Sequence, residues 1–221
     1  MGLHLGQIFD VLNTPNSKRQ TNLDEQLQKF PYINGGIFAE QIRPVALDAQ
    51  ARLKLTICSK ADWSEISASI FGSLFQGVMN EKERRQLGAH YTSEVNILKV
   101  INPLFLDELY IEFDEVKYDV KKLNVFHKKL STLNFLDPAC GCCNFLVVAY
   151  RELRKLELEV LKRKDKIGQM MLIGAQDLSI INVNQFYGIE IEGFPTLVAR
   201  VAMYLVDHQM NIELSKSFGH T

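Results

Sequence analysis

The chain has 221 residues, of which 47% are hydrophobic and 23% are charged, and its formal net charge is −1. This length suits one large domain or a domain with an appendage, and the composition is that of an ordinary globular protein. The balanced charge gives no support to nucleic-acid binding, because domains of that class usually carry a basic surplus. No apolar stretch is long enough to span a bilayer, and the first residues do not resemble a secretory signal. We therefore expect a cytoplasmic protein without a membrane partner.

The first part of the chain, residues 1–130, is expected to be mainly helical. Up to about residue 60 the pattern indicates helical pieces and loops, and the run Asn34-Gly35-Gly36 predicts a turn. Over residues 62–79 apolar side chains recur at steps of four, which predicts an amphipathic helix.

A further helix is predicted to begin near Glu94, capped by Thr92 or Ser93. Pro103 should end or kink this helix because proline lacks the N–H that a helix interior needs. Residues 111–131 are charged and favour a connecting helix or a loop.

From Leu133 onward the pattern changes to one of alternating strands and helices, which is typical of a parallel α/β unit. The predicted elements are a strand over 133–138, a helix from Phe145 to Val160, a strand over 185–191 and a helix over 194–214. We therefore place a domain boundary near residue 130, with the α/β part occupying 131–221.

The four cysteines are unevenly placed. Cys58 stands alone, whereas Cys140, Cys142 and Cys143 fall within four residues. A secreted disulfide framework spaces its cysteines along the chain, so reduced thiols are the better expectation. Adjacent thiolates fit poorly around one tetrahedral ion, and we predict no metal site.

The turn after the first strand carries the clearest chemical signal, the string LDPACGCCNF from Leu136 to Phe145. Small residues let a ligand approach the backbone closely, an acid can hold an ammonium group, and the following helix offers free N–H donors. The string resembles motif I of the S-adenosylmethionine (SAM) dependent DNA adenine-N6 methyltransferases, usually written DPACGSGNF. This resemblance implies that the cofactor is bound by Asp137, Pro138, Ala139, Gly141 and Asn144.

The chain departs from that motif at Cys142, where the family has Ser, and at Cys143, where it has Gly. A glycine is expected where the backbone crowds the ligand or takes a positive φ. We therefore expect Cys143 either to crowd the cofactor or to hold a left-handed conformation at a cost of about 1–3 kcal/mol. Weakened SAM binding is the predicted consequence.

Two further strings resemble motifs of the same enzymes. GAHYTS, which ends at Ser93, resembles motif X, and its place before motif I matches the gamma order of motifs. The resemblance implies that Tyr91 and Thr92 close the methionine end of SAM. YGIEIE resembles motif II, where an acid at the strand end accepts the ribose hydroxyls. Period-two alternation puts Glu190 and Glu192 on one face, and we favour Glu190.

Over most of its length the chain is similar to the MmeI-like type IIG restriction–modification enzymes, through FPYINGGIF, RRQLGAHYTSEVNILKV and FYGIEIEGFP among other strings. The resemblance implies a site-specific DNA adenine-N6 methyltransferase that uses SAM. It also implies an α/β fold: a partial, Rossmann-like half sheet preceded by a mainly helical connector. DNA would be the partner, through a recognition domain that is missing or separate.

The string NPPY, which holds the target adenine in that family, does not occur in the sequence. We expect a partial chain that carries motifs X, I and II, assign no catalytic residue, and expect no methyl transfer by this chain alone. The alternatives are a non-catalytic remnant, or a SAM-binding or partner-docking module of a split methyltransferase whose second chain carries NPPY. A half sheet has an open edge, so self-association is expected as well.

Overall fold

The computed structural model describes residues 2–33, 38, 46–61, 66–67, 70, 92–167 and 179–218. Two compact units divide the chain, Met1–Ser64 and Glu65–Thr221. The turn predicted at Asn34–Gly36, most of the helix predicted at 62–79 and residues 88–91 of the motif X string lie outside the described residues. The domain boundary near residue 130 stays a prediction.

The first unit consists of short helices joined by loops, as the sequence indicates. They are α1 (Gly2–Asn13), the 3-10 turn η1 (Asn16–Lys18), α2 (Glu25–Gln28) and α3 (Ala49–Cys58). Asp24 and Asp48 cap α2 and α3 through side-chain oxygens that accept backbone N–H groups. The Arg19 guanidinium donates to the carbonyls of Val11, Thr14 and Phe30, and so ties the end of α1 to the segment after α2.

From residue 92 onward the described part of the second unit opens with a run of helices: α6 (Glu94–Ile101), the π-helical turn η2 (Asn102–Leu106), α7 (Asp107–Val116) and α8 (Val120–Leu130). Pro103 lies in the π-helical turn, where its missing N–H is tolerated, and the helix continues into α7. The charged region 111–131 forms the end of α7 and all of α8. Asp119 separates the two by capping α8 with its carboxylate.

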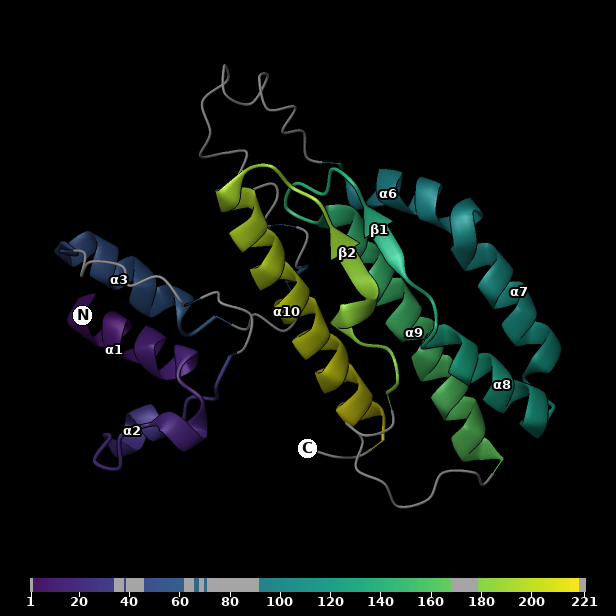
Figure 1. The fold of residues 1–221 in the computed structure, drawn as a ribbon, viewed down its shortest axis with the longest axis horizontal. Helices are drawn as coiled ribbons and strands as arrows, with labels where there is room; N and C mark the ends of the chain where they lie inside the picture. The colour runs from purple at the N-terminus through teal and green to yellow at the C-terminus, as the bar shows by residue number, and fades with distance from the viewer. Residues whose placement is uncertain are drawn as a thin grey trace. The chain divides into compact units, whose positions relative to one another are not determined.

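The α/β part follows in the predicted order: β1 (Phe135–Asp137), α9 (Asn144–Lys166), the 3-10 turn η4 (Val183–Gln185), β2 (Phe186–Gly188) and α10 (Gly193–Ser217). The strands are parallel and pair Phe135 with Phe186. In Figure 1 they lie in front of α9, with α10 to their left and α6 and α7 to their right. The fold of this part is therefore α/β, with a small parallel sheet of two strands among the described residues.

Both strands are shorter than predicted, and Gln185 lies in the 3-10 turn η4 before the second strand. Gln185 was predicted to begin the second strand, but its buried side chain donates from Nε2 to the carbonyls of Leu130 and Leu133, both at 2.9 Å. Its Oε1 accepts the Asn182 N–H in a capping box. Gln185 thus joins the end of α8 to the start of β2.

Helix α9 is the centre of the core. One face meets α6, where Ile97 and Ile101 pack on Val148 and Ala149. Another face carries Tyr150, whose ring meets the Phe186 ring edge-on at 5.2 Å. Its fully or nearly fully buried apolar residues are Leu146, Val147, Val148, Ala149, Tyr150, Leu153, Leu156, Leu158, Val160 and Leu161.

A buried carboxylate lies among these apolar residues. Glu157 is 1% exposed, and both of its oxygens are saturated with donors. The donors are His127 Nε2 at 3.2 Å, the Ile180 and Ile181 N–H groups at 2.7 and 3.2 Å, Ser179 Oγ at 2.6 Å and Arg154 Nε at 3.3 Å. Glu157 therefore connects α8, α9 and the segment that leads into β2.

No sequence pattern predicts a partner for His127, yet its side chain is buried and both ring nitrogens make hydrogen bonds. Lys164 Nζ lies 2.8 Å from its Nδ1. A lysine ammonium has no acceptor, so Nδ1 accepts this bond and Nε2 carries the proton that is donated to Glu157. Burial lowers the pKa of Lys164, and the nearby Glu157 opposes that shift.

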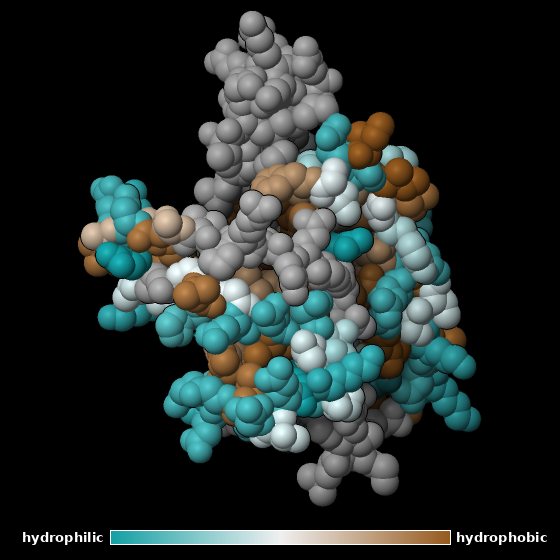
Figure 2. Space-filling model, turned by 60° about the vertical axis from the view of Figure 1, so that its left-hand side comes forward, coloured by the Kyte–Doolittle hydropathy of each residue, from teal (hydrophilic) through white to brown (hydrophobic). Residues whose placement is uncertain are grey.

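Apolar side chains also reach the surface, as the brown residues among teal ones in Figure 2 show. Around the sheet the most exposed are Leu136, Tyr187, Ile189, Ile191 and Phe194, each more than half exposed. Such a set suits self-association, which stays a prediction. None of the helices in the described part of the chain is long and apolar enough to cross a membrane.

Candidate functional site

Backbone hydrogen bonds join the turn after β1 to the end of β2. The Ile189 N–H donates to the Asp137 carbonyl at 2.9 Å, and the Cys140 N–H donates to the Ile189 carbonyl at 3.0 Å. The pairing of the strands thus continues one step beyond them and into the turn. As a result, Glu190 is held beside the residues that follow Asp137.

Two residues of the turn have left-handed backbones: Gly141, with φ 53°, and Cys143, with φ 69°. For Gly141 this conformation is free of steric cost, whereas for a residue with a Cβ it costs about 1–2 kcal/mol. Cys143 is also the N-cap of α9 and makes no side-chain cap bond. The expectation of a left-handed conformation at Cys143 is confirmed.

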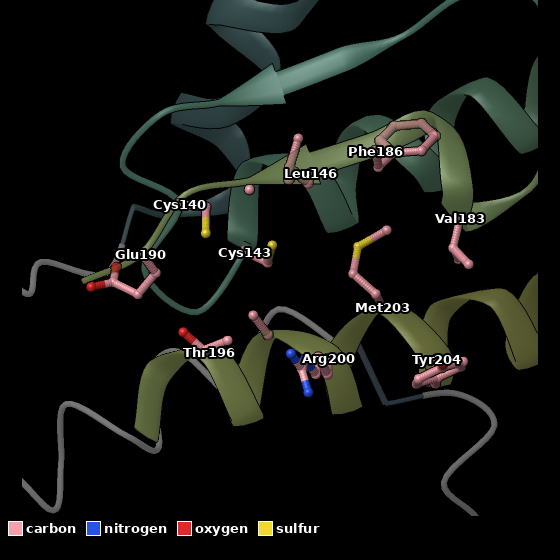
Figure 3. A pocket seen from close by; sticks show the side chains of 12 residues that line it. Cys140, Cys143, Leu146, Val183, Phe186, Glu190, Thr196, Arg200, Met203 and Tyr204 are labelled. Atoms are coloured by element: carbon pink, nitrogen blue, oxygen red, sulfur yellow. The ribbon is translucent and has the colours of Figure 1, made fainter. Parts of the chain in front are cut away.

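A cavity of about 310 Å³ opens between this turn, β2 and α10. Its volume lies at the small end of the range for ligand pockets, about 300–1,000 Å³. Figure 3 shows the carboxylate of Glu190 at one end, the sulfurs of Cys140 and Cys143 above, and the side chains of α10 below. Glu192 does not line the cavity, and its N–H donates to Glu190 Oε1 at 2.9 Å. Between the two acids that the sequence offers, Glu190 is thus the one that faces the cavity.

Gly188 makes room for the turn. A Cβ on this residue would lie 2.6 Å from Cys140 Sγ and 3.1 Å from Cys140 Cβ. Atoms do not approach that closely, so the turn could not pack against β2 if residue 188 had a side chain. The cavity wall therefore depends on Gly188.

The three thiols of the turn differ in acidity. A hydrogen bond with the Cys143 thiol lowers the pKa of Cys140, against the effect of burial and of the charges on Asp137 and Glu190. The same bond, with burial, raises the pKa of Cys143. Burial and then Glu190 raise the pKa of Cys142 to about 11. Cys140 is therefore the most nucleophilic of the three near neutral pH.

Asp137 and Pro138 line a second cavity, of about 440 Å³, on the side of β1 that faces α6 and η2. This cavity is mostly apolar, with side chains such as Val100, Leu104 and Phe105. The Asp137 carboxylate accepts the Ala139 N–H at 3.1 Å, which stabilises the turn. The predicted site residues are thus divided, with Asp137 on one side of the sheet and Glu190 on the other.

The remaining predicted residues lie near the turn or cannot be placed. Asn144 opens α9, and its Oδ1 is buried without a hydrogen-bond partner. Thr92 precedes Ser93, which is the N-cap of α6 as predicted but makes no side-chain cap bond. None of the hydrogen bonds between described residues joins Thr92 to the turn. Tyr91 lies outside the described residues.

Sequence reasoning missed the contribution of α10 to the cavity. Thr196, Arg200 and Tyr204 follow at steps of four, so they share one face of the helix, and Met203 lies beside them. The signal was present as the polar Thr196 and the basic Arg200 in the otherwise apolar first part of the helix, residues 193–206.

The residues present fit an adenosine-like cofactor. Gly141 leaves the backbone open to close approach, and Glu190 offers a carboxylate at the strand end, where ribose hydroxyls are commonly bound. The unpaired Asn144 oxygen adds a buried acceptor at the helix N-terminus. Among the described turn residues, Cys143 works against a close fit through its left-handed backbone.

Known proteins resemble the whole chain. A solved structure of the type IIL restriction–modification enzyme MmeI in complex with DNA is 56% identical, with a TM-score of 0.88, and the match covers 99% of this chain and 29% of that one. DNA methyltransferase A of Bacillus subtilis (strain 168) is 38% identical over 216 residues, which are 96% of this chain and 24% of the relative. The chain therefore spans less than a third of the length of either protein.

Residues 113–221 match the family described as the DNA-methyltransferase domain of MmeI. These residues include β1, the turn, β2 and α10, and hence the whole cavity that faces Glu190. Residues 113–221 thus belong to the family described as the DNA-methyltransferase domain of MmeI, and the chain as a whole is similar to the type IIL restriction–modification enzyme MmeI.

Proposed function

We propose that the chain is the cofactor-binding segment of a SAM-dependent DNA adenine-N6 methyltransferase of a restriction–modification system. The observation that carries the proposal is the bond from the Cys140 N–H to the Ile189 carbonyl, which brings the motif I turn and Glu190 to one cavity. In this proposal residues 131–221 are the front half of a Rossmann-like domain, and residues 1–130 are a helical connector.

Each predicted site residue is given a role in this proposal. Glu190 accepts the ribose hydroxyls, since its carboxylate faces the cavity at the end of β2. The turn residues Pro138, Ala139 and Gly141 let the cofactor approach the backbone, and Asp137 and Asn144 are proposed to add polar contacts from the two ends of the turn. Tyr91 and Thr92 close the methionine end.

SAM supplies an electrophilic methyl group on its sulfonium, which the adenine amine of DNA attacks directly. The residues described here bind and orient that donor, and none of them is assigned a catalytic role. Because the sequence contains no NPPY, we propose that a segment outside these 221 residues, or a second chain, holds the flipped adenine in line.

A second candidate is a remnant that has lost cofactor binding. The left-handed Cys143 favours it, because the strain of about 1–3 kcal/mol is comparable with a tenfold loss of affinity, which is about 1.4 kcal/mol. The two candidates differ in whether the natural chain binds SAM.

Calorimetric titration of SAM separates these candidates. We would titrate the natural chain, Cys143→Gly, Glu190→Gln and, as a matched control, Glu192→Gln. The proposal expects micromolar binding by the natural chain and by Glu192→Gln, tighter binding by Cys143→Gly, and at least tenfold weaker binding by Glu190→Gln. Binding by Cys143→Gly alone would identify a decayed site, and binding by none of the four would overturn the proposal.

A further inference from the structure

Cys140 and Cys143 occupy the two ends of a tight turn. The Cys143 N–H donates to the Cys140 carbonyl at 2.7 Å, which is the bond that closes a four-residue turn. In such a turn the end Cα atoms lie within about 7 Å, and a disulfide spans Cα atoms about 4.4–6.8 Å apart. The backbone of the turn therefore suits a disulfide between its ends.

The two sulfurs also face each other across one small space. The position that a Cβ on Gly188 would take lies 2.6 Å from Cys140 Sγ and 3.5 Å from Cys143 Sγ. Both sulfurs line the cavity in Figure 3, one from each end of the turn. Because Gly188 has no side chain, both sulfurs have space beside β2.

The two thiols are chemically unequal in the way that oxidation requires. Cys140 is partly exposed, whereas Cys143 is 5% exposed. Their shared hydrogen bond lowers the pKa of Cys140 and raises that of Cys143. Cys140 is thus the more accessible of the two thiols and the one that loses its proton more readily.

We propose that Cys140 and Cys143 form a redox-active dithiol that hydrogen peroxide converts into a disulfide within the turn. The Cys140 thiolate attacks one peroxide oxygen, the O–O bond breaks, and the departing hydroxide takes a proton to become water. The Cys143 sulfur then attacks the Cys140 sulfur, the S–O bond breaks, and the second hydroxide takes the Cys143 proton. Two thiols lose two electrons, and one peroxide becomes two waters.

This site is independent of the proposed cofactor, because the reaction needs only the two thiols and the oxidant. Cys142 is the internal control. It is adjacent in sequence and buried, but it does not line the cavity, and its pKa is raised to about 11. Cys58, in the other unit, is the second control.

The experiment treats the reduced full chain with a small excess of hydrogen peroxide, alkylates it, and maps the products by peptide mass spectrometry. The natural chain and Cys142→Ser should each lose two hydrogens from the peptide that contains Cys140, with Cys140 and Cys143 protected from alkylation until a dithiol reductant is added. Cys140→Ser and Cys143→Ser should show no such loss, and Cys58→Ser should behave as the natural chain does. Circular dichroism would establish that the serine variants are folded.

The proposal is overturned if all four cysteines of the treated natural chain are still alkylated, or if Cys142→Ser abolishes the bridge. It is also overturned if the bridge links two chains through Cys58, or if Cys140 proceeds to sulfinic acid without forming a disulfide. The natural chain and Cys142→Ser decide the question by themselves, even if Cys140→Ser or Cys143→Ser does not fold.

Discussion

The two halves of α9 differ in whether their buried polar groups have hydrogen-bond partners. Toward the C-terminal end, Glu157 is buried with both oxygens saturated by donors from three segments. At the N-terminal end, Cys143 has a left-handed backbone and the Asn144 Oδ1 is buried without a partner. Strain and unsatisfied groups tend to persist where function needs them, and satisfied networks where the fold needs them. The contrast locates stability in one half of the helix and the candidate site in the other.

The largest effect should come from Glu157→Ala, which leaves Arg154 buried without this carboxylate. Breaking a buried ion pair by removing one partner costs about 3–5 kcal/mol. Urea denaturation would measure the loss, and Glu159→Ala, an exposed position on the same helix, is the matched control. A loss of less than about 1 kcal/mol would show that the network contributes little, and the contrast would fail.

Near the candidate site, Gly188→Ala in β2 should destabilise the protein by about 1–3 kcal/mol, because the new Cβ would meet Cys140 Sγ at 2.6 Å. Gly193→Ala is the control, since a Cβ there meets nothing within 4 Å. Adding Cys140→Gly to Gly188→Ala should recover part of the stability. No recovery would mean that the clash lies elsewhere than in the turn.

A smaller loss of stability is expected in the middle of α9, where Arg151 donates two hydrogen bonds, of 2.6 and 3.0 Å, to Glu94 of α6. The pair is partly exposed, so solvent screening limits Glu94→Gln to about 0.2–1 kcal/mol. The bond from Arg151 lowers the pKa of Glu94 below its ordinary 4.5. A lowered carboxyl pKa stabilises the fold above pH 4.5, and this contribution is lost as the pH falls through the lowered value. Unfolding at pH 7 and at pH 3 should therefore show a difference between the natural chain and Glu94→Gln that shrinks with acid.

The smallest change is expected for Asn144→Ala. Its Oδ1 has no hydrogen bond to lose, so the free energy of unfolding should change by no more than about 0.5 kcal/mol. A buried polar group that did have a partner would cost about 1–3 kcal/mol. Thermal unfolding measures the difference, and a large loss would reveal that the two halves of α9 are alike after all.

What the sequence could predict was local. The order of strand, helix, strand and helix from Leu133 onward is confirmed, since apolar periodicity and the turn after Asp137 mark it directly. The effect of Pro103 and the left-handed Cys143 were also predictable, because each depends on one residue and its immediate neighbours.

What the sequence could not predict depends on partners far along the chain. His127 meets Glu157 30 residues later, and Arg154 meets Asn211 57 residues later, with no spacing rule to pair them. Gln185 fits a strand by pattern, but it lies in the 3-10 turn before β2, and its side-chain amide donates to Leu133, 52 residues earlier. The contribution of α10 to the cavity was not predicted for the same reason, since only the fold brings Arg200 and Glu190 to one cavity.

The bond between the Cys140 N–H and the Ile189 carbonyl has a consequence for folding. It can form only after α9 and the segment behind it have brought β2 back beside β1. Closing so long a loop costs entropy before any contact repays it, so parallel pairing of this kind is intrinsically slow. The helices should therefore form first, and the cavity should appear as one of the last features of the folded chain. During synthesis and refolding, the Cys140 thiol would then remain open to solvent until this late step.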